Sequence, residues 1–262
     1  MNFILPVFLF SLSYMIPQEA SIGRAVITEV APDSPAAKAG LQPGDVVLKI
    51  NNRTINNVAD LSYNVRLNLG SQMTMRVQRT DPATHQSEIK DLRVRARWAP
   101  PDGQGPTGIA IGSQYPFTES VSYPPWEAFP KGVQATLDSL VFLRNEVIAW
   151  TKGGPSAIKV SGPIGIAQAT GEVVKQAGWK PLLEFAALLS INLGILNILP
   201  LPMLDGGRVV FVLLEILRRG KRIAPEKEAL VHFIGFAAII TLVVVISYFD
   251  VLRIIRGESL FR

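Results

Sequence analysis

Residues 31–45 of this chain are APDSPAAKAGLQPGD. Proline, serine and glycine at the two ends of this stretch are typical of turns, and its alanine-rich centre, residues 36–41, predicts a short helix. Residues 25–30 alternate apolar and polar side chains, and residues 46–50 form a short apolar run, so both predict strands. The order strand, short helix, strand favours a small domain in which helices pack on a sheet.

The pattern continues beyond this stretch. Residues 58–69 predict a helix, because apolar side chains recur on one face at i, i+4 and i+8. These side chains are Leu61, Val65 and Leu69. Residues 74–79 and 89–95 predict two further strands. We therefore expect a folded domain at residues 20–98.

The motif of residues 31–45, followed by this strand and helix, resembles the core signature of bacterial PDZ domains. The resemblance implies a barrel-like sheet with helices, and a groove in which an extended peptide binds as an added strand. It places Ile22, Val26, Leu61 and Val65 along the groove. An alternative is a PDZ fold that binds no peptide and only blocks access to another site.

A change of composition follows the domain. Residues 99–125 are rich in Pro, Gly and Ser, which predicts a linker with one short strand at residues 108–111. An amphipathic, membrane-associated region is expected at residues 126–180. Its first part, residues 126–150, predicts a helix with one apolar stripe, which either lies on a bilayer surface or packs on a protein core.

The composition predicts a membrane-embedded part. Hydrophobic residues make up 48% of the 262 residues and charged residues only 18%, which is too apolar for an ordinary soluble domain. The apolar residues concentrate in a C-terminal membrane domain, residues 182–262. Residues 229–249, at about 1.5 Å per residue, are long enough to cross roughly 30 Å of hydrocarbon. We expect a multi-domain α+β membrane protein.

The first residues are also apolar. Residues 1–17 are shorter than the roughly 20 residues that a spanning helix needs, and no Lys or Arg precedes Arg24. This pattern predicts either an atypical signal sequence or the remnant of a transmembrane helix that begins at an internal methionine.

The segment at residues 192–207, NLGILNILPLPMLDGG, is unusual for an apolar helix. Asp205 is unfavourable there unless it pairs, binds metal or faces water. Pro200 and Pro202 remove backbone donors, and the glycines after Asp205 allow sharp bends, so we expect a broken helix at residues 182–207. Broken backbone at membrane depth is tolerated only inside protein or beside a water-filled cavity. The plain alternative is a helix end with Asp205 as N-cap.

The order Asn-x-x-Pro-x-Pro-x-Leu-Asp-Gly in this segment resembles the zinc-binding third core helix of the site-two protease family, most closely the bacterial sigma-E-regulating proteases. Residues 161–167 and the first three residues are similar to other parts of those proteins. The resemblance implies that Asp205 is a carboxylate ligand of a catalytic zinc. It also assigns four residues to substrate binding and to the bend: Asn192, Asn197, Pro200 and Pro202. The implied reaction is regulated intramembrane proteolysis of transmembrane substrate proteins.

The same family carries a His-Glu-x-x-His helix that completes the zinc site and supplies the general base. This chain has two histidines, His85 and His232, and neither has a histidine four residues later. His85 lies in a polar turn and predicts a solvated side chain, whereas His232 opens an apolar helix and predicts an interfacial one. We therefore expect an incomplete zinc site, no catalytic residue and no hydrolysis by this chain alone, as in an N-terminally truncated protease.

The charge and the cysteine content exclude some classes of partner and ligand. The formal charge is +5, and no aromatic residues interleave with the basic ones, so we expect no nucleic-acid partner. The absence of cysteine excludes disulfides and thiolate metal ligands and leaves the redox compartment open.

Basic residues cluster between the two C-terminal apolar segments: Arg208, Arg218, Arg219, Lys221, Arg222 and Lys227. The positive-inside rule puts this loop in the cytoplasm. We expect a multi-pass protein of the inner (cytoplasmic) membrane, in contact with lipid, with its PDZ-like domain on the extracytoplasmic side.

A hypothesis from another class stays open. The chain could be a non-catalytic membrane adaptor that binds extended peptides through its PDZ-like domain. An in-frame His-Glu-x-x-His upstream of Met1 favours the protease, and stop codons in all frames favour the adaptor. A PDZ-containing serine protease is not favoured, because no Gly-x-Ser-x-Gly turn is present.

Overall fold

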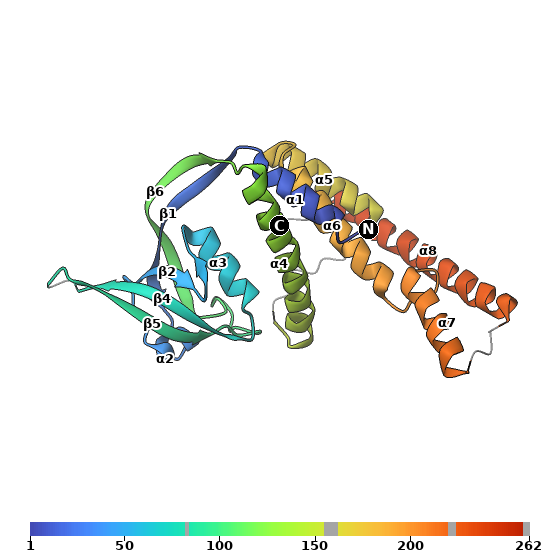
Figure 1. Cartoon of the computed structure of the whole chain (residues 1–262), viewed down its shortest axis with the longest axis horizontal. Helices are drawn as coiled ribbons and strands as arrows, with labels where there is room; N and C mark the ends of the chain where they lie inside the picture. The colour runs from blue at the N-terminus through green and yellow to red at the C-terminus, as the bar shows by residue number, and fades with distance from the viewer. Residues whose placement is uncertain (82–83, 155–161, 220–223, 259–262) are drawn as a thin grey trace. The chain divides into compact units, whose positions relative to one another are not determined.

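A computed structural model of the chain describes residues 1–81, 84–154, 162–219 and 224–258 (Figure 1). The chain divides into two compact units, which we call the helical unit and the sheet unit. The helical unit comprises Met1–Ile16, Tyr123–Thr136 and Ile158–Arg262, and the sheet unit comprises Pro17–Ser122 and Leu137–Ala157. One helix, α4 (Pro125–Thr151), contributes its first part to the helical unit and its second part to the sheet unit.

The sheet unit is built on one antiparallel sheet. Its elements are β1 (Gln18–Val30), α2 (Pro35–Ala39), β2 (Val46–Ile50), β3 (Arg53–Thr54), α3 (Val58–Leu67), β4 (Gln72–Thr80), β5 (Ser87–Arg95) and β6 (Ile109–Val121). The strands follow the order β5-β4-β2-β1-β6, with β3 paired to β2. Every pairing is antiparallel, so the sheet is one open path with β5 and β6 at its ends. Its core is apolar and includes fully buried Ile27, Leu61 and Met75.

The strands and helices expected from residues 25 to 95 are confirmed, but β1 begins at Gln18, seven residues before the expected start, and the other ends shift by two residues at most. The linker expected at residues 99–125 is wrong in part. Residues 109–121 form β6, which pairs with β1 from Val30↔Ile109 to Gln18↔Val121. The strand expected to end at residue 111 is therefore much longer, because β1 pairs with it along one edge, with two register shifts.

The motif at residues 31–45 adopts the predicted turns and helix for identifiable reasons. The Ser34 hydroxyl accepts the Ala37 N–H at 3.1 Å, and Pro35 occupies the first helical position. Gly40 ends α2 with φ +82°, a conformation that glycine adopts without strain.

Asp45 closes the motif from inside the domain. Its carboxylate is fully buried and accepts the Gln42 N–H at 2.9 Å and two guanidinium N–H groups of Arg79 at 2.7 and 2.8 Å. These hydrogen bonds raise the pKa of Arg79 above its ordinary value. The Asp45–Arg79 pair therefore joins two parts of the domain: the turn that precedes β2, and strand β4.

Replacing Asp45 by alanine should weaken the sheet unit. Breaking a buried, hydrogen-bonded ion pair costs about 3–5 kcal/mol, and we expect amides of β2 and β4 to exchange with deuterium correspondingly faster. The matched control is Asp91→Ala, because Asp91 forms an exposed ion pair with Arg76 on the same sheet. Equal exchange in the two variants would contradict the structural role of Asp45.

The helical unit contains the remaining helices. They are α1 (Leu5–Met15), the first part of α4, α5 (Pro163–Ala177), α6 (Pro181–Ile198), α7 (Asp205–Leu217) and α8 (Pro225–Ile255). α1 and α6 lie side by side (Figure 1). Ser13 Oγ donates to Glu184 Oε1 at 2.8 Å, and Ser190 Oγ donates to the Asn2 carbonyl at 3.1 Å. Glu184 on α6 therefore has its hydrogen-bond partner, Ser13, on α1 within the same unit.

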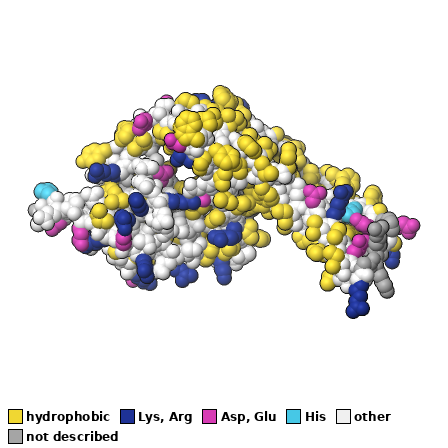
Figure 2. Space-filling model, viewed as in Figure 1, with side chains coloured by type: hydrophobic (Ala, Val, Ile, Leu, Met, Phe, Trp, Pro, Cys, Tyr) yellow, Lys and Arg dark blue, Asp and Glu magenta, His cyan; other side chains and the backbone are white. Residues whose placement is uncertain are grey.

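Two helices of the described chain, α6 and α8, are long and apolar enough to cross a membrane. Hydrophobic side chains gather over these helices in the space-filling view (Figure 2). The expected basic loop is partly wrong, because residues 205–217 form the apolar helix α7, with Arg208 in its first turns. Lys221 and Arg222 lie outside the described residues, as do Arg262 and Ser161 of the segment 161–167.

A carboxylate on α8 holds the start of α5. Asp250 is 1% exposed, and its Oδ2 accepts the N–H groups of Gly162 and Gly165, both at 2.8 Å. Its Oδ1 accepts a hydrogen bond from Arg253 at 2.8 Å. No side chain of the residue before α5 caps this helix, because that residue is Gly162. Asp250, which is on α8, therefore caps the N-terminus of α5 in place of a side chain at the N-cap position.

The variant Asp250→Ala should fray α5. Losing an N-cap acceptor costs about 0.5–2 kcal/mol, so the amides of Gly162 and Gly165 should exchange faster by hydrogen-exchange NMR in detergent micelles. Asp250→Asn keeps one acceptor oxygen and should lie between wild type and alanine. If the alanine variant exchanged at the wild-type rate, Asp250 would not be the cap.

Candidate functional site

The break expected within residues 182–207 lies between α6 and α7. α6 ends at Ile198, α7 begins at Asp205, and residues 199–204 form a tight turn. Pro200 and Pro202 lie in this turn and cannot continue a helix. The Leu201 N–H donates to the Leu199 carbonyl at 2.7 Å, and the Leu204 N–H donates to the Leu201 carbonyl at 3.2 Å. The expectation of a broken helix is confirmed.

The two glycines after the turn permit close approach of backbone. Gly206 and Gly207 are buried. A Cβ at Gly206 would meet the carbonyl groups of Ile198 and Leu199, and a Cβ at Gly207 would meet that of Leu201. Any larger residue would therefore push the start of α7 away from the turn.

Asp205 is the first residue of α7 and is exposed. The residue at the N-cap position is Leu204, so Asp205 is not the N-cap considered in the sequence. Within the described part of the chain its carboxylate makes no hydrogen bond or ion pair, so its oxygens are available to a ligand. The N-terminus of a helix also favours a negative charge.

A zinc site needs more ligands than this turn supplies. Carboxylate oxygen is a suitable zinc ligand, and catalytic sites use three protein ligands and a water. Among the described residues, no group of three or more His, Cys, Asp or Glu side chains could hold a metal ion. Asp205 therefore fits one ligand position of a zinc site, and the described residues do not provide the others.

The other residues assigned from the sequence lie beside the break. Asn192, exposed, and Asn197, half-buried, are on α6 before the turn, and Pro200 is exposed within it. In the described structure no hydrogen bond engages either asparagine amide, so both can meet a ligand backbone. The structure brings all of these residues to one end of α6.

His232 is the residue near this turn that sequence reasoning missed. It was expected to have an interfacial role, but its Nδ1 accepts the Met203 N–H at 2.8 Å. Its ring also lies 5.4 Å, between centroids, from the ring of Phe211 on α7. The sequence gives one hint, which is that a histidine near the start of a long apolar helix needs a polar partner.

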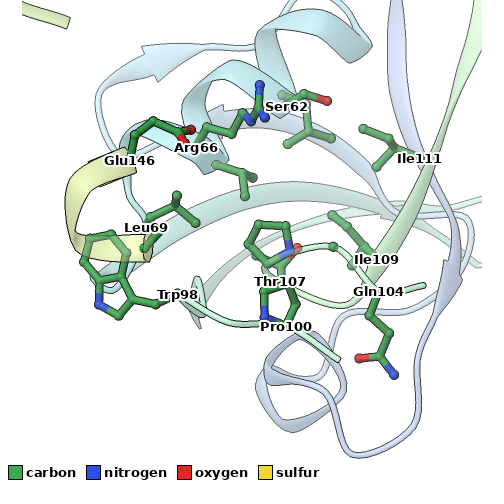
Figure 3. Close-up of a pocket in the computed structure, with 15 residues that line it drawn as sticks. Ser62, Arg66, Leu69, Trp98, Pro100, Gln104, Thr107, Ile109, Ile111 and Glu146 are labelled. Atoms are coloured by element: carbon green, nitrogen blue, oxygen red, sulfur yellow. The ribbon is translucent and has the colours of Figure 1, made fainter. Parts of the chain in front are cut away.

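The sheet unit contains a separate cavity of about 430 Å³ (Figure 3). α3 lines one side of it, and β6 lines another with Ile109 and Ile111. Residues 98–107, together with Glu146 and Ala149 of α4, complete the wall. Leu61 and Val65 line the cavity, as the groove prediction requires. Ile22 and Val26 lie on β1 and do not line it; β6, taken for a linker, occupies that place.

The second part of α4 packs against α3 within the sheet unit. Asn145 Nδ2 donates to the carbonyls of Arg66 and Leu67 at 2.9 and 3.1 Å and so caps the end of α3. Asp138 accepts two hydrogen bonds from Arg53 at 2.5 and 2.7 Å and one from Tyr63 at 2.9 Å. This contact raises the pKa of Arg53, because the Asp138 carboxylate favours the charged guanidinium. The sequence left open whether this helix lies on a bilayer surface or packs on a protein core. The second part of α4 packs on protein.

Comparison with known proteins decides the family. The family described as Peptidase family M50 matches residues 1–242. The chain belongs to peptidase family M50. It is 36% identical over 254 residues to a protein of Oceanobacillus iheyensis called zinc metalloprotease RasP, a match that covers 97% of this chain and 58% of the relative.

Two further relatives are similar to this chain over nearly its whole length. The regulator of sigma-W protease RasP of Bacillus subtilis is 33% identical over 97% of this chain and 57% of its own length. The probable protease eep of Enterococcus faecalis is 32% identical over 96% of this chain and 56% of its own length. The chain thus spans somewhat more than half the length of these relatives. Among M50 proteins it is therefore similar to proteins named as zinc metalloproteases and proteases.

The turn of this M50 chain should not tolerate a side chain at position 206. Gly206→Ala places a Cβ against two carbonyl groups, which costs about 1–3 kcal/mol, so amides of residues 204–208 should exchange faster with deuterium. Gly171→Ala in α5 is the control, because a Cβ there has no atom within 4 Å. Unchanged exchange at residues 204–208 in Gly206→Ala would show that the turn does not depend on this glycine.

Proposed function

We propose that this chain is part of an intramembrane zinc metalloendopeptidase, a site-two protease that cleaves transmembrane protein substrates. The observation that carries the proposal is the broken backbone between α6 and α7, where an exposed Asp205 with no partner in the described residues begins a helix beside two prolines. Membership of family M50 and the similarity to named zinc metalloproteases support it.

Each residue of the turn has a role in this proposal. Asp205 supplies one carboxylate to the zinc, whose chemistry is to activate water and polarise a peptide carbonyl. Asn192 and Asn197 hold the substrate backbone in an extended form, because their free amides can both donate and accept. Pro200 and Pro202 keep the backbone broken, so that the cleft remains open to a peptide. The other zinc ligands come from outside the described residues.

Two helices support the proposed membrane setting. α6 and α8 are apolar enough to span a bilayer, and broken backbone between them is acceptable where it lines a cavity. We place the protein in the inner membrane, in contact with lipid, with the sheet unit on the extracytoplasmic side. The basic residues Arg218 and Arg219 after α7 support a cytoplasmic position for that end.

Zinc binding tests the role of Asp205. Because one carboxylate cannot hold zinc tightly, titration of this chain alone should show no tight stoichiometric site; a tight 1:1 site would contradict the proposal. In a chimera that joins the chain to the part of the Oceanobacillus iheyensis relative outside the match, Asp205→Ala should lower cleavage of a transmembrane reporter by about a thousandfold or more. Asp91→Ala removes an exposed carboxylate of the sheet unit and should leave cleavage unchanged. Full cleavage by the Asp205→Ala chimera would refute the assignment.

We also propose that the sheet unit is a PDZ domain that binds an extended peptide. The cavity between α3 and β6 is of the size typical for ligand pockets, and β6 is an end strand in the described sheet. A peptide can therefore add as a further strand along β6, with an apolar side chain between Leu61 and Ile111. This arrangement replaces Ile22 and Val26 by Ile109 and Ile111 as the strand side of the groove.

Filling the cavity should block peptide binding. Ser62 is exposed on α3 and lines the cavity, so Ser62→Trp can occupy it without changing the buried core. With fluorescent peptides selected from a random library, we expect affinity to fall by about tenfold or more, as for a lost interface anchor. Ser62→Ala should bind as wild type does. Selection of no peptide, or equal affinity of the tryptophan variant, would favour a domain that only blocks access.

The adaptor remains the second candidate, and one observation favours it. The sheet unit holds a ligand-sized cavity, which an adaptor would use to bind a peptide. If the chimera binds zinc no better than this chain alone and the peptide still binds, the adaptor is the better description.

A further inference from the structure

The turn at residues 199–204 satisfies its backbone donors almost entirely by itself. Leu199 donates to Leu196, Leu201 to Leu199 and Leu204 to Leu201, at 3.1, 2.7 and 3.2 Å. Pro200 and Pro202 have no N–H. The remaining donor belongs to Met203, and its partner is a side chain on a different helix, His232 Nδ1 at 2.8 Å.

Met203 has a conformation that needs support. Its φ is +81°, in the left-handed region that residues other than glycine rarely adopt. Such a residue persists only when its surroundings hold it there. It lies two positions before Asp205, so its backbone angles set where α7 starts and where the Asp205 side chain is placed.

α8 contacts the turn at two points on one face. His232 accepts the Met203 N–H, and Gly235, one turn further along, lies against Pro202 so closely that a Cβ there would meet the proline ring and its carbonyl. The hydrogen bond requires an unprotonated Nδ1, which puts the ring proton on Nε2. Glu228, four residues earlier on α8, has its Oε1 3.8 Å from this Nε2, and the Phe211 ring covers the imidazole. Among the described residues, the imidazole therefore makes one hydrogen bond, through Nδ1, and its buried Nε2 makes none.

We propose that His232 is a positioning residue for Asp205. By accepting the Met203 N–H, it fixes the left-handed residue of the turn and thereby the start of α7, from which the Asp205 carboxylate projects. The meaning of this role for metal binding rests on the proposed function of Asp205. The conformational role does not require a metal, and its test is independent of one.

The test uses two substitutions of His232 in the full chain in detergent micelles. Asn Oδ1 occupies nearly the position of His Nδ1, so His232→Asn keeps the acceptor, whereas His232→Leu removes it. We expect the Met203 amide to exchange about fivefold faster or more in His232→Leu, the factor for one hydrogen bond, and to return to near the wild-type rate in His232→Asn. Equal exchange in wild type and His232→Leu overturns the proposal, and so does an asparagine variant that behaves like the leucine variant.

A second readout follows the ligand position itself. Because the chain contains no cysteine, Asp205→Cys introduces a single thiol whose reaction with a maleimide reports how position 205 is presented. His232→Leu should change this labelling rate several-fold, and His232→Asn should restore it. An unchanged rate in the leucine variant means that His232 does not position residue 205 and overturns the proposal.

Two controls separate this role from general damage. Thr241→Val removes a side-chain hydrogen bond on the same helix, Thr241 Oγ1 to the Ala237 carbonyl at 2.8 Å, and should change neither readout. Exchange of α5 amides should be the same in all variants; if it rises in His232→Leu as much as at Met203, the residue is only structural and the proposal fails. If instead both readouts behave as expected but Asp205→Ala leaves the chimera active, the positioning role stands and the proposed zinc role fails.

Discussion

A backbone N–H group among apolar side chains needs a hydrogen-bond partner, and this requirement shapes the turn between α6 and α7. Two of its six residues are prolines, which reduces the number of donors that the turn must satisfy. Leu201 and Leu204 find acceptors within the turn, and only Met203 depends on another helix. With the backbone satisfied in this way, the side chain of Asp205 is left unengaged in the described structure. The Asp205 carboxylate, the candidate metal ligand, is therefore available because no backbone N–H of the turn donates a hydrogen bond to it.

In the sheet unit, a few specific contacts likewise fix the elements that line the cavity. β6 pairs with β1 on one side, and α3 faces its apolar residues across the cavity. The end of α3 is in turn capped by Asn145 from α4, so the helix that forms one wall is fixed at its C-terminus from outside the domain's own strands. Asp138 adds a second attachment of α4, to Tyr63 in the middle of α3 and to Arg53 on β3. A rigid wall opposite an end strand is the geometry that strand addition needs.

The sequence predicted local elements well where side chains alternate or recur in a regular period. Leu61 and Val65 marked the face of α3 that lines the cavity, and the prolines and glycines around Asp205 marked the break. It failed where a partner far along the chain decides the outcome. Residues 109–121 contain Gly and Pro and look like a linker, yet β1 pairs with them from Ile109 to Val121 along one edge. The hydrogen bonds between His232 and Met203 and between Asp250 and Gly162 join α8 to residues 29 and 88 positions away in the sequence, so no local pattern predicts them.

The contact between Pro202 and Gly235 fixes the register of α8. Moving a helix by one residue along its axis shifts it by about 1.5 Å and turns the next side chain by about 100°. Either neighbour of Gly235, Ile234 or Phe236, would then be driven into the proline ring. A slide of α8 by one residue past the turn is therefore sterically blocked unless the turn moves with it.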